Sequence, residues 1–133
     1  LSMWQCQVVE ITKAMSFSPK VLILDEPTSA LAHNETESLF NVIRTLRDQG
    51  VIMMYDEPSR GIDVNAKQQI FQIMWDQARK GVSSIFVSSE LEELLEVCHR
   101  ILIMHMGHII GEVYPEDLTI DQLYADCMGG TIE

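Results

Sequence analysis

The chain has 133 residues, of which 47% are hydrophobic, and a formal net charge of −11. This length suits one domain of the usual ~100–150 residues. An acidic chain without a basic stripe argues against nucleic-acid binding. No apolar run approaches the ~20 residues of a membrane span, and the N-terminal residues do not resemble a secretory signal. We therefore expect a cytoplasmic protein that does not insert into a membrane directly and reaches one only through a partner.

Charge, cysteine and histidine contents add few candidate sites. Residues 1–55 carry four basic and six acidic side chains, and residues 56–133 carry five and fourteen. The simplest interpretation of the acidic second half is a solvated surface. The three cysteines lie far apart without a Cys-x-x-Cys pair, which favours neither a disulfide framework nor a zinc site. His105 and His108 are close in sequence, but no third ligand for a metal is evident.

The pattern of apolar residues predicts alternating helices and strands. Helices are expected at 2–16, 35–48, 64–80 and 90–98, with a short one within 118–128. Strands are expected at 21–24, 51–55, 84–87, 101–104 and 108–113, the last two joined by a turn at Gly107. This order indicates an α/β fold with a mostly parallel sheet flanked by helices. Short continuous apolar runs further predict strands buried on both faces.

Two strands end in the same acidic motif. Residues 24–29, Leu-Asp-Glu-Pro-Thr-Ser, match residues 55–60, Tyr-Asp-Glu-Pro-Ser-Arg, at an offset of 31. An aspartate at a strand tip can support Mg²⁺, and the next glutamate can address a water molecule. The motif thus makes Asp25 and Asp56 candidate metal-binding residues and Glu26 and Glu57 candidate catalytic residues. A single copy would equally suit an ordinary acidic turn, but two copies favour the functional interpretation.

Residues 1–54 resemble the first cassette of an ATP-binding-cassette (ABC) ATPase. Val21 to Leu31 is similar to the Walker B segment and D-loop, and Leu1-Ser2-Met3-Trp4-Gln5 stands where the signature Leu-Ser-Gly-Gly-Gln is expected. The resemblance implies an incomplete P-loop NTPase core. It also implies Mg²⁺ support by Asp25, polarisation of water by Glu26, and nucleotide contacts from Ser2, Gln5 and Ser29.

Residues 56–133 resemble a different cassette, the second one in the fused two-cassette subunits of ribose-, galactose- or xylose-type importers. The similarity lies in Asp56 to Val64 and in Ser88 to Glu93. It implies further nucleotide contacts from Asp63, Ser89 and Glu90. We interpret the chain as a truncated subunit with an internal deletion that joins 1–55 to 56–133 in one compact unit, although an assembly error in the sequence would leave the same trace.

Parts of the family pattern are missing from the 133 residues. None of the seven glycines begins the phosphate-binding sequence Gly-x-x-x-x-Gly-Lys-Ser/Thr. Met3 and Trp4 replace signature glycines, whose small size lets the backbone approach a phosphate. The family implies ATP, Mg²⁺, a second cassette and membrane permease subunits at the inner face of the plasma membrane, yet we expect no ATP hydrolysis by this chain alone.

Two other interpretations are compatible with the sequence. The chain could be a docking or regulatory module that binds an intact cassette through residues 29–31 and 61–63. A receiver-like domain phosphorylated on Asp25 or Asp56 is disfavoured because no lysine follows the strand at 84–87. In each case, uncovered sheet edges and apolar helix faces predict poor solubility or oligomers.

Overall fold

A computed structural model describes residues 2–129 and divides the chain into two compact units, Leu1–Val87 and Ser88–Glu133. The helices are α1 (Met3–Met15), α2 (His33–Asp48), α3 (Val64–Arg79), α4 (Leu91–Val97), α5 (Ile120–Cys127) and the 3-10 helix η1 (Pro115–Asp117). The strands are β1 (Val21–Asp25), β2 (Ile52–Asp56), β3 (Ile85–Val87), β4 (Ile101–His105) and β5 (His108–Val113). The expected elements are confirmed, and η1 is the one that the sequence pattern missed.

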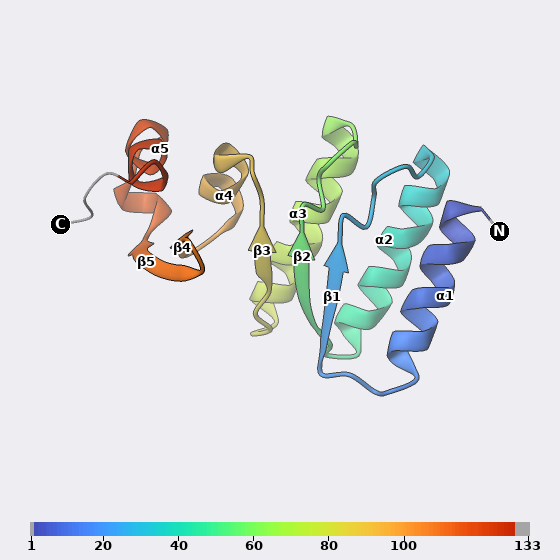
Figure 1. The fold of residues 1–133 in the computed structure, drawn as a ribbon. Coiled ribbons are helices and arrows are strands. Elements are labelled where there is room, and N and C mark those ends of the chain that lie inside the picture. Colours follow the sequence, from blue (N-terminus) through green and yellow to red (C-terminus); the bar gives the residue numbers. More distant parts are fainter. Residues whose placement is uncertain (1, 130–133) are drawn as a thin grey trace. The chain divides into compact units, whose positions relative to one another are not determined.

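The first unit is built on a parallel sheet with strand order β1-β2-β3 (Figure 1). This confirms the α/β class. Along β1 and β2, each residue pairs with the residue 31 positions later, from Val21 with Ile52 to Asp25 with Asp56. The pairing register therefore equals the offset of the sequence repeat, and the two acidic motifs lie at the same height on neighbouring strands.

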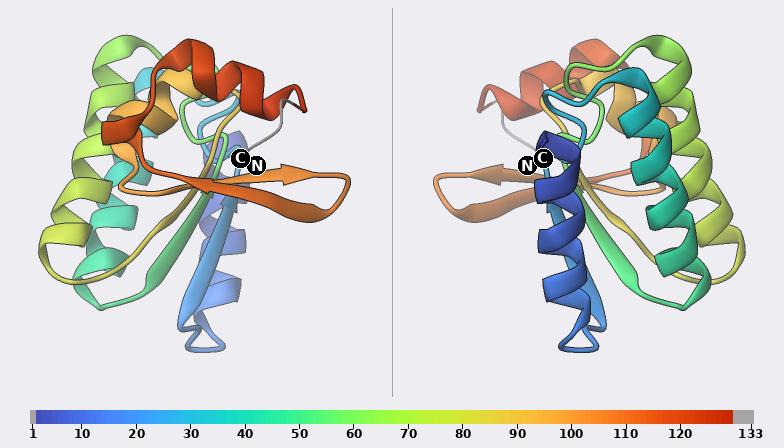
Figure 2. Two further views of the ribbon diagram at one scale, coloured as in Figure 1. Left: turned by 90° about the vertical axis from the view of Figure 1, so that its left-hand side faces the viewer. Right: turned by 90° about the vertical axis from the view of Figure 1, so that its right-hand side faces the viewer.

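Helices α2 and α3 cover the same side of this sheet (Figure 2). They bury one set of alternating strand residues, including Leu22, Leu24 and Met53. The opposite set stays open, and Ile23 is 63% and Ile85 54% exposed. The prediction of strands buried on both faces is wrong, because a short apolar run shows that a strand is apolar but not which element covers it.

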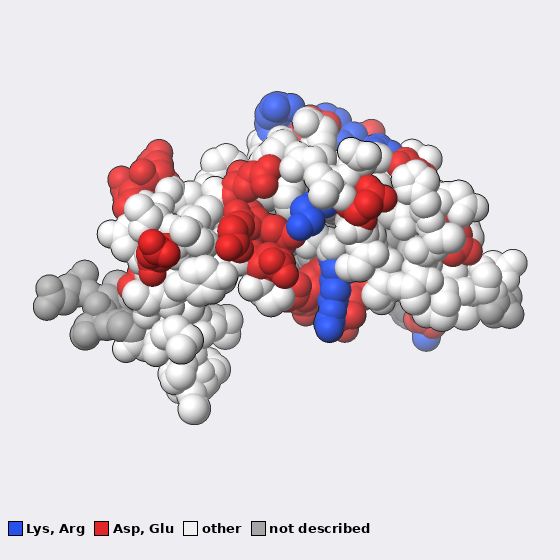
Figure 3. Space-filling view, turned by 90° about the horizontal axis from the view of Figure 1, so that it is seen from above, with Lys and Arg blue, Asp and Glu red and all other residues white. Residues whose placement is uncertain are grey.

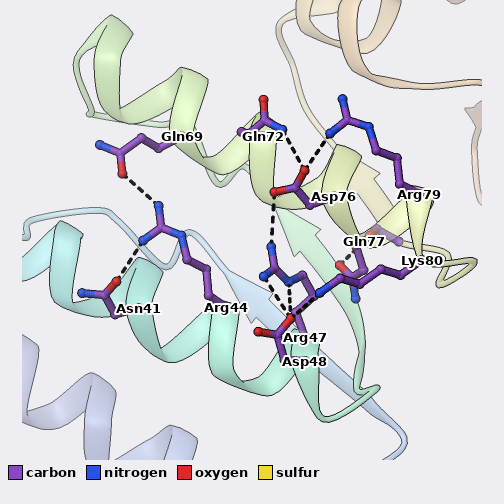
Figure 4. A network of polar contacts seen from close by, with 11 residues as sticks. Asn41, Arg44, Arg47, Asp48, Gln69, Gln72, Asp76, Gln77, Arg79 and Lys80 are labelled. Carbon is purple, nitrogen blue, oxygen red and sulfur yellow. Dashed lines mark hydrogen bonds and ion pairs between the residues drawn. The ribbon is translucent and has the colours of Figure 1, made fainter.

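Polar contacts join α2 to α3 on their outer side (Figure 4). Arg47 pairs with Asp48 at 2.9 Å and with Asp76 at 3.6 Å, and Lys80 reaches Asp48 at 2.8 Å. Hydrogen bonds from Arg47 and then Lys80 lower the pKa of Asp48 to about 2. Buried Gln77 donates to the carbonyl oxygen of Val51 at 3.0 Å, which fixes α3 against the start of β2. These contacts hold the C-terminal ends of α2 and α3 together beside the start of β2.

The second unit has its own sheet, in which β4 and β5 pair antiparallel with a bulge between Ile103 and Met104. Its core contains Ile101, Ile103 and Leu123, with α4 and α5 supplying further apolar contacts. Within residues 2–129, none of the helices has the length and apolar character that crossing a membrane requires.

Candidate functional site at the carboxyl ends of the parallel strands

The two acidic motifs meet at one edge of the sheet. We call residues 25–32 the first turn and residues 56–63 the second turn. Asp25 and Asp56 are direct register partners, and the backbone N–H of Glu26 donates to the carbonyl oxygen of Asp56 at 2.8 Å. The N–H of Glu57 makes the equivalent bond to Val87 at 2.9 Å. Figure 3 looks onto this end of the molecule and shows acidic groups gathered there with isolated basic ones among them.

Both glutamates adopt a conformation that is unusual for residues other than glycine. The φ angle is 39° at Glu26 and 48° at Glu57. A left-handed conformation at such a residue costs ~1–3 kcal/mol and is found preferentially at functional sites. The two copies thus turn the chain in the same way, with the aspartate on the strand and the glutamate just beyond it.

The turns are joined through a buried hydroxyl group. Thr28, which is 1% exposed, donates to the carbonyl oxygens of Pro58 at 2.8 Å and Arg60 at 3.3 Å. The Arg60 guanidinium forms an ion pair with the carboxylate of Glu26. Two side chains therefore link the first turn to the second, one through the backbone and one through charge.

The two D-loop candidates have structural contacts of their own. Asp63 Oδ1 accepts hydrogen bonds from the N–H groups of Asn65 at 2.9 Å and Ala66 at 3.0 Å, so this side chain caps α3. These bonds, led by the one from Ala66, lower the pKa of Asp63, and nearby His33 lies 3.6 Å from its second oxygen. Ser29 is partly buried, and its N–H donates to the carbonyl oxygen of Glu26 at 3.1 Å.

The surroundings of these carboxylates offer few further ligands. Among residues 2–129, no group of three or more His, Cys, Asp or Glu side chains could hold a metal ion. A hollow of about 210 Å³ beside Asp25 is lined by α1 and β1. Pockets for small molecules usually measure ~300–1,000 Å³.

Ser89 and Glu90 belong to the second unit and lie at the start of α4. Glu90 is the N-terminal cap residue but makes no side-chain capping bond. The neighbouring Ser88 fixes the approach to the helix, because its hydroxyl accepts from the N–H of Glu90 at 3.0 Å and donates to the buried Glu93 at 3.0 Å. Both candidates are exposed.

Comparison with known proteins identifies the family. The chain is 36% identical over 125 residues to the xylose import ATP-binding protein XylG of Photobacterium profundum, a match that covers 90% of this chain and 24% of the relative. It is 31% identical over all 133 residues to the ribose import ATP-binding protein RbsA of Clostridium perfringens, covering 20% of that relative. The RbsA of Caldanaerobacter subterraneus is 42% identical over 79 residues, which are 59% of the chain and 16% of the relative.

The chain belongs to the family of sugar import ABC ATP-binding proteins. It spans less than a quarter of the length of each of these three relatives. No protein-family profile matches it. The recognition made from the motifs is therefore confirmed at the level of the family.

The signature candidates of this sugar import homologue cap their own helix. Ser2 Oγ accepts from the N–H of Gln5 at 3.2 Å, and Gln5 Oε1 accepts from the N–H of Ser2 at 2.8 Å. This reciprocal capping box satisfies two N–H groups at the start of α1. Met3 is 53% exposed beside them and Trp4 is half-buried. Leu1, the first residue of the expected signature, lies outside the described residues.

Sequence reasoning missed the Thr28 hydrogen bonds and the partner of Arg60. The structure pairs Arg60 with Glu26 in a partly exposed salt bridge. The spacing of the repeat held the necessary signal. Two strands separated by one helix and offset by 31 residues are candidates for parallel neighbours in that same register, which would have placed the two turns side by side.

Proposed function

We propose that the chain is a piece of the ATP-hydrolysing subunit of a carbohydrate ABC importer and that, by itself, it neither binds nor hydrolyses ATP. The observation that carries the proposal is the pair of Asp-Glu-Pro turns at one sheet edge, in a chain similar throughout to sugar import ATP-binding proteins. Ligands of parallel α/β sheets bind beyond this edge. The relatives' names refer to xylose and ribose import, which supports sugars as the proposed substrate class.

The roles of the residues follow from the family resemblance. Asp25 and Asp56 correspond to the aspartates that support Mg²⁺, and Glu26 and Glu57 to the glutamates that polarise the attacking water. Nucleotide contacts in the intact family correspond to Ser2, Gln5, Ser29, Asp63, Ser89 and Glu90. Within the described residues, Ser2, Gln5 and Asp63 are also helix-capping residues.

The proposal that the chain alone does not bind ATP rests on the phosphate cradle. Catalysis of phosphoryl transfer depends mainly on positioning and on stabilisation of charge. The backbone N–H groups and the lysine of a Walker A loop provide both, and the 133 residues contain no such sequence. Another polypeptide segment or a second cassette would have to supply them.

We also propose that an internal deletion joined residues 1–55 of one cassette to residues 56–133 of another. The order of the motifs supports this, because residues 1–54 resemble a first cassette and the resemblance to a second cassette begins at Asp56. β2 then ends in a second Asp-Glu-Pro motif next to the first. An intact assembly would place the chain at the inner face of the plasma membrane with permease subunits.

Calorimetry of the 133-residue chain with MgATP tests the proposal, with Asp25→Ala and Asp56→Ala as matched variants. We expect no binding heat from a chain shown by circular dichroism to be folded. Binding that disappears in one variant would overturn the proposal and would identify the aspartate that serves the nucleotide.

A second candidate function is a non-enzymatic module that docks on an intact cassette. The open side of the sheet favours it, since Val21, Ile23 and Ile85 are each about half exposed or more. Size-exclusion chromatography with a purified XylG or RbsA relative would test this. A stable complex lost on Ile23→Glu supports docking, and separate elution at micromolar concentrations contradicts it.

A further inference from the structure

We propose that Arg60 is an internal counter-cation that holds the carboxylate of Glu26 against the second turn and thereby keeps it from acting on water or a cation. The contact is autoinhibitory in the sense that Arg60, a residue of the same chain, binds the Glu26 carboxylate. This inference rests on the proposed function in one respect, namely that Glu26 corresponds to the water-polarising residue of the family.

The geometry of the pair supports this role. The guanidinium Nη1 of Arg60 forms both a hydrogen bond and an ion pair with Glu26 Oε1. The Glu26 side chain is 36% exposed, whereas that of Arg60 is 65% exposed. The less accessible partner is thus the carboxylate, and one of its two oxygens is in contact with the guanidinium. A general base must reach the proton that it removes, so a guanidinium at this position competes directly with water.

The backbone that carries Arg60 is fixed from the other turn. The buried Thr28 hydroxyl donates to the carbonyl oxygen of Arg60 itself, at 3.3 Å, and to that of Pro58, at 2.8 Å. The N–H of Glu26 donates to Asp56 at 2.8 Å. These hydrogen bonds already fix the two backbones relative to each other. The Arg60–Glu26 ion pair therefore forms with a smaller loss of conformational entropy.

The ion pair between the turns is not reciprocal, because only the second turn has an arginine at this position. Ser29 stands in the first turn where Arg60 stands in the second. The second turn supplies the cation, and the first turn supplies the carboxylate. The pair thus depends on two unlike turns lying on neighbouring strands in the 31-residue register, which is a consequence of how residues 1–55 and 56–133 are joined.

The reactivity of the Glu26 carboxylate provides a test without nucleotide. The folded chain is treated with a water-soluble carbodiimide and glycine ethyl ester, and the coupling rate of Glu26 is measured by peptide mass spectrometry relative to exposed Glu116. We expect Arg60→Met, which keeps the apolar stem, to raise this relative rate about two- to fivefold, the range that an exposed ion pair supports. Arg60→Lys, which keeps the charge, should stay near the wild-type rate.

Two further arms make the result specific. Arg60→Ser, which installs the first-turn residue, should match Arg60→Met. Salt at ~1 M shortens the Debye length to about 3 Å and should raise the wild-type rate toward that of Arg60→Met, a response that purely steric packing would not give. Equal rates in wild type and in both uncharged variants, each shown to be folded, would overturn the inference.

This outcome is separable from that of the nucleotide experiment. A rate that rises on Arg60→Met in a chain that nonetheless binds MgATP would leave the Arg60–Glu26 contact standing and refute the proposed inactivity. Unchanged rates in a chain that binds no MgATP would refute the contact and leave the proposed function standing.

Discussion

The first and second turns begin alike and then differ at the positions where they meet. Each continues from its strand into Asp-Glu-Pro, each glutamate has a positive φ angle, and each precedes a 16-residue helix. All five later positions differ, and the three that bear on the contacts are Thr28, Ser29 and Ala32 of the first turn, which correspond to Ser59, Arg60 and Asp63 of the second. The shared residues set the backbone path, and the divergent ones include those that join the copies.

The difference shows that the turns are complementary and not interchangeable. Thr28 reaches carbonyl groups of the second turn, and Arg60 reaches the carboxylate of the first. Asp63 caps α3 through its own side chain, whereas Ala32 has no side chain that can do so. At α2 the Glu35 carboxylate instead accepts from the N–H of Ala32 at 3.0 Å. Equal motifs in a sequence therefore do not imply equal sites.

The largest expected effect concerns the shared packing of the two strands. Leu24 is 5% exposed and faces the helices, so Leu24→Ala should lower the free energy of unfolding by ~2–5 kcal/mol through lost burial and a cavity. Ile23→Ala is the matched control, because Ile23 is 63% exposed on the opposite face and should change stability by at most ~0.5 kcal/mol. Urea denaturation measures both, and equal losses would contradict the one-sided sheet.

The contact between the turns comes next in size. Thr28→Val leaves the carbonyl groups of Pro58 and Arg60 without this donor, and we expect the free energy of unfolding to fall by about 1–3 kcal/mol. Thr45→Val is the control, since the exposed Thr45 hydroxyl bonds only within α2, to Asn41. If the two substitutions proved equally mild in urea denaturation, the turns would not be joined as described.

A smaller effect is expected from the cap that only the second turn provides. Asp63→Ala should lower the thermal midpoint, whereas Asp63→Asn should keep most of the stability because Asn also caps helices well. The folded pKa of Asp63 is lowered from an ordinary value near 3.8. Its ionised cap therefore stabilises the fold above that value, and the contribution is lost as pH falls through the lowered pKa. Thermal melts from pH 5 to pH 2 should show a smaller loss in Asp63→Asn than in wild type, because Asp48 still titrates in both, and equal losses would contradict the assignment.

The smallest effect concerns the strand residues just before the two aspartates. Tyr55 replaces Leu24 in the second copy, and its buried hydroxyl has no hydrogen-bond partner among residues 2–129. Burial also raises the pKa of Tyr55, which keeps the hydroxyl neutral. Tyr55→Phe should leave the free energy of unfolding unchanged or raise it by up to about 1 kcal/mol, because an unpaired buried group is removed. If urea denaturation instead showed a decrease of more than about 1 kcal/mol in the free energy of unfolding, the hydroxyl would have a hydrogen-bond partner.

The sequence predicted most of the fold because its signals are local. Apolar runs bounded by Pro, Gly and acidic residues placed each strand, and 3.6-residue spacing placed the helices. The start of α2 was placed two residues late, since Ala32 is a poor capping residue and the capping bond comes from Glu35. The open face of the sheet could not be predicted, because what covers a strand depends on other parts of the chain.

The candidate site was predictable in part for the same reason. The Asp-Glu-Pro repeat is visible in the sequence, and its position at the strand ends is confirmed for Asp25 and Asp56. The Thr28 and Arg60 contacts depend on the pairing of strands far apart in the chain. The sequence also predicts Ser2 as the cap of α1, which is confirmed, whereas the reciprocal bond to Gln5 was missed, although Ser followed three residues later by Gln is a known capping signal.

The 31-residue register is the most direct test of the account, because the shared edge and both contacts between the turns depend on it. Methyl-labelled chain can be examined by nuclear Overhauser spectroscopy for contacts between Ile23 and Met54, which are register partners on β1 and β2. The account predicts a cross-peak between these two methyl groups, together with one between Val21 and Ile52. Cross-peaks that pair Ile23 with Ile52 and leave Met54 without a β1 partner would place the strands two residues out of register and separate the two turns.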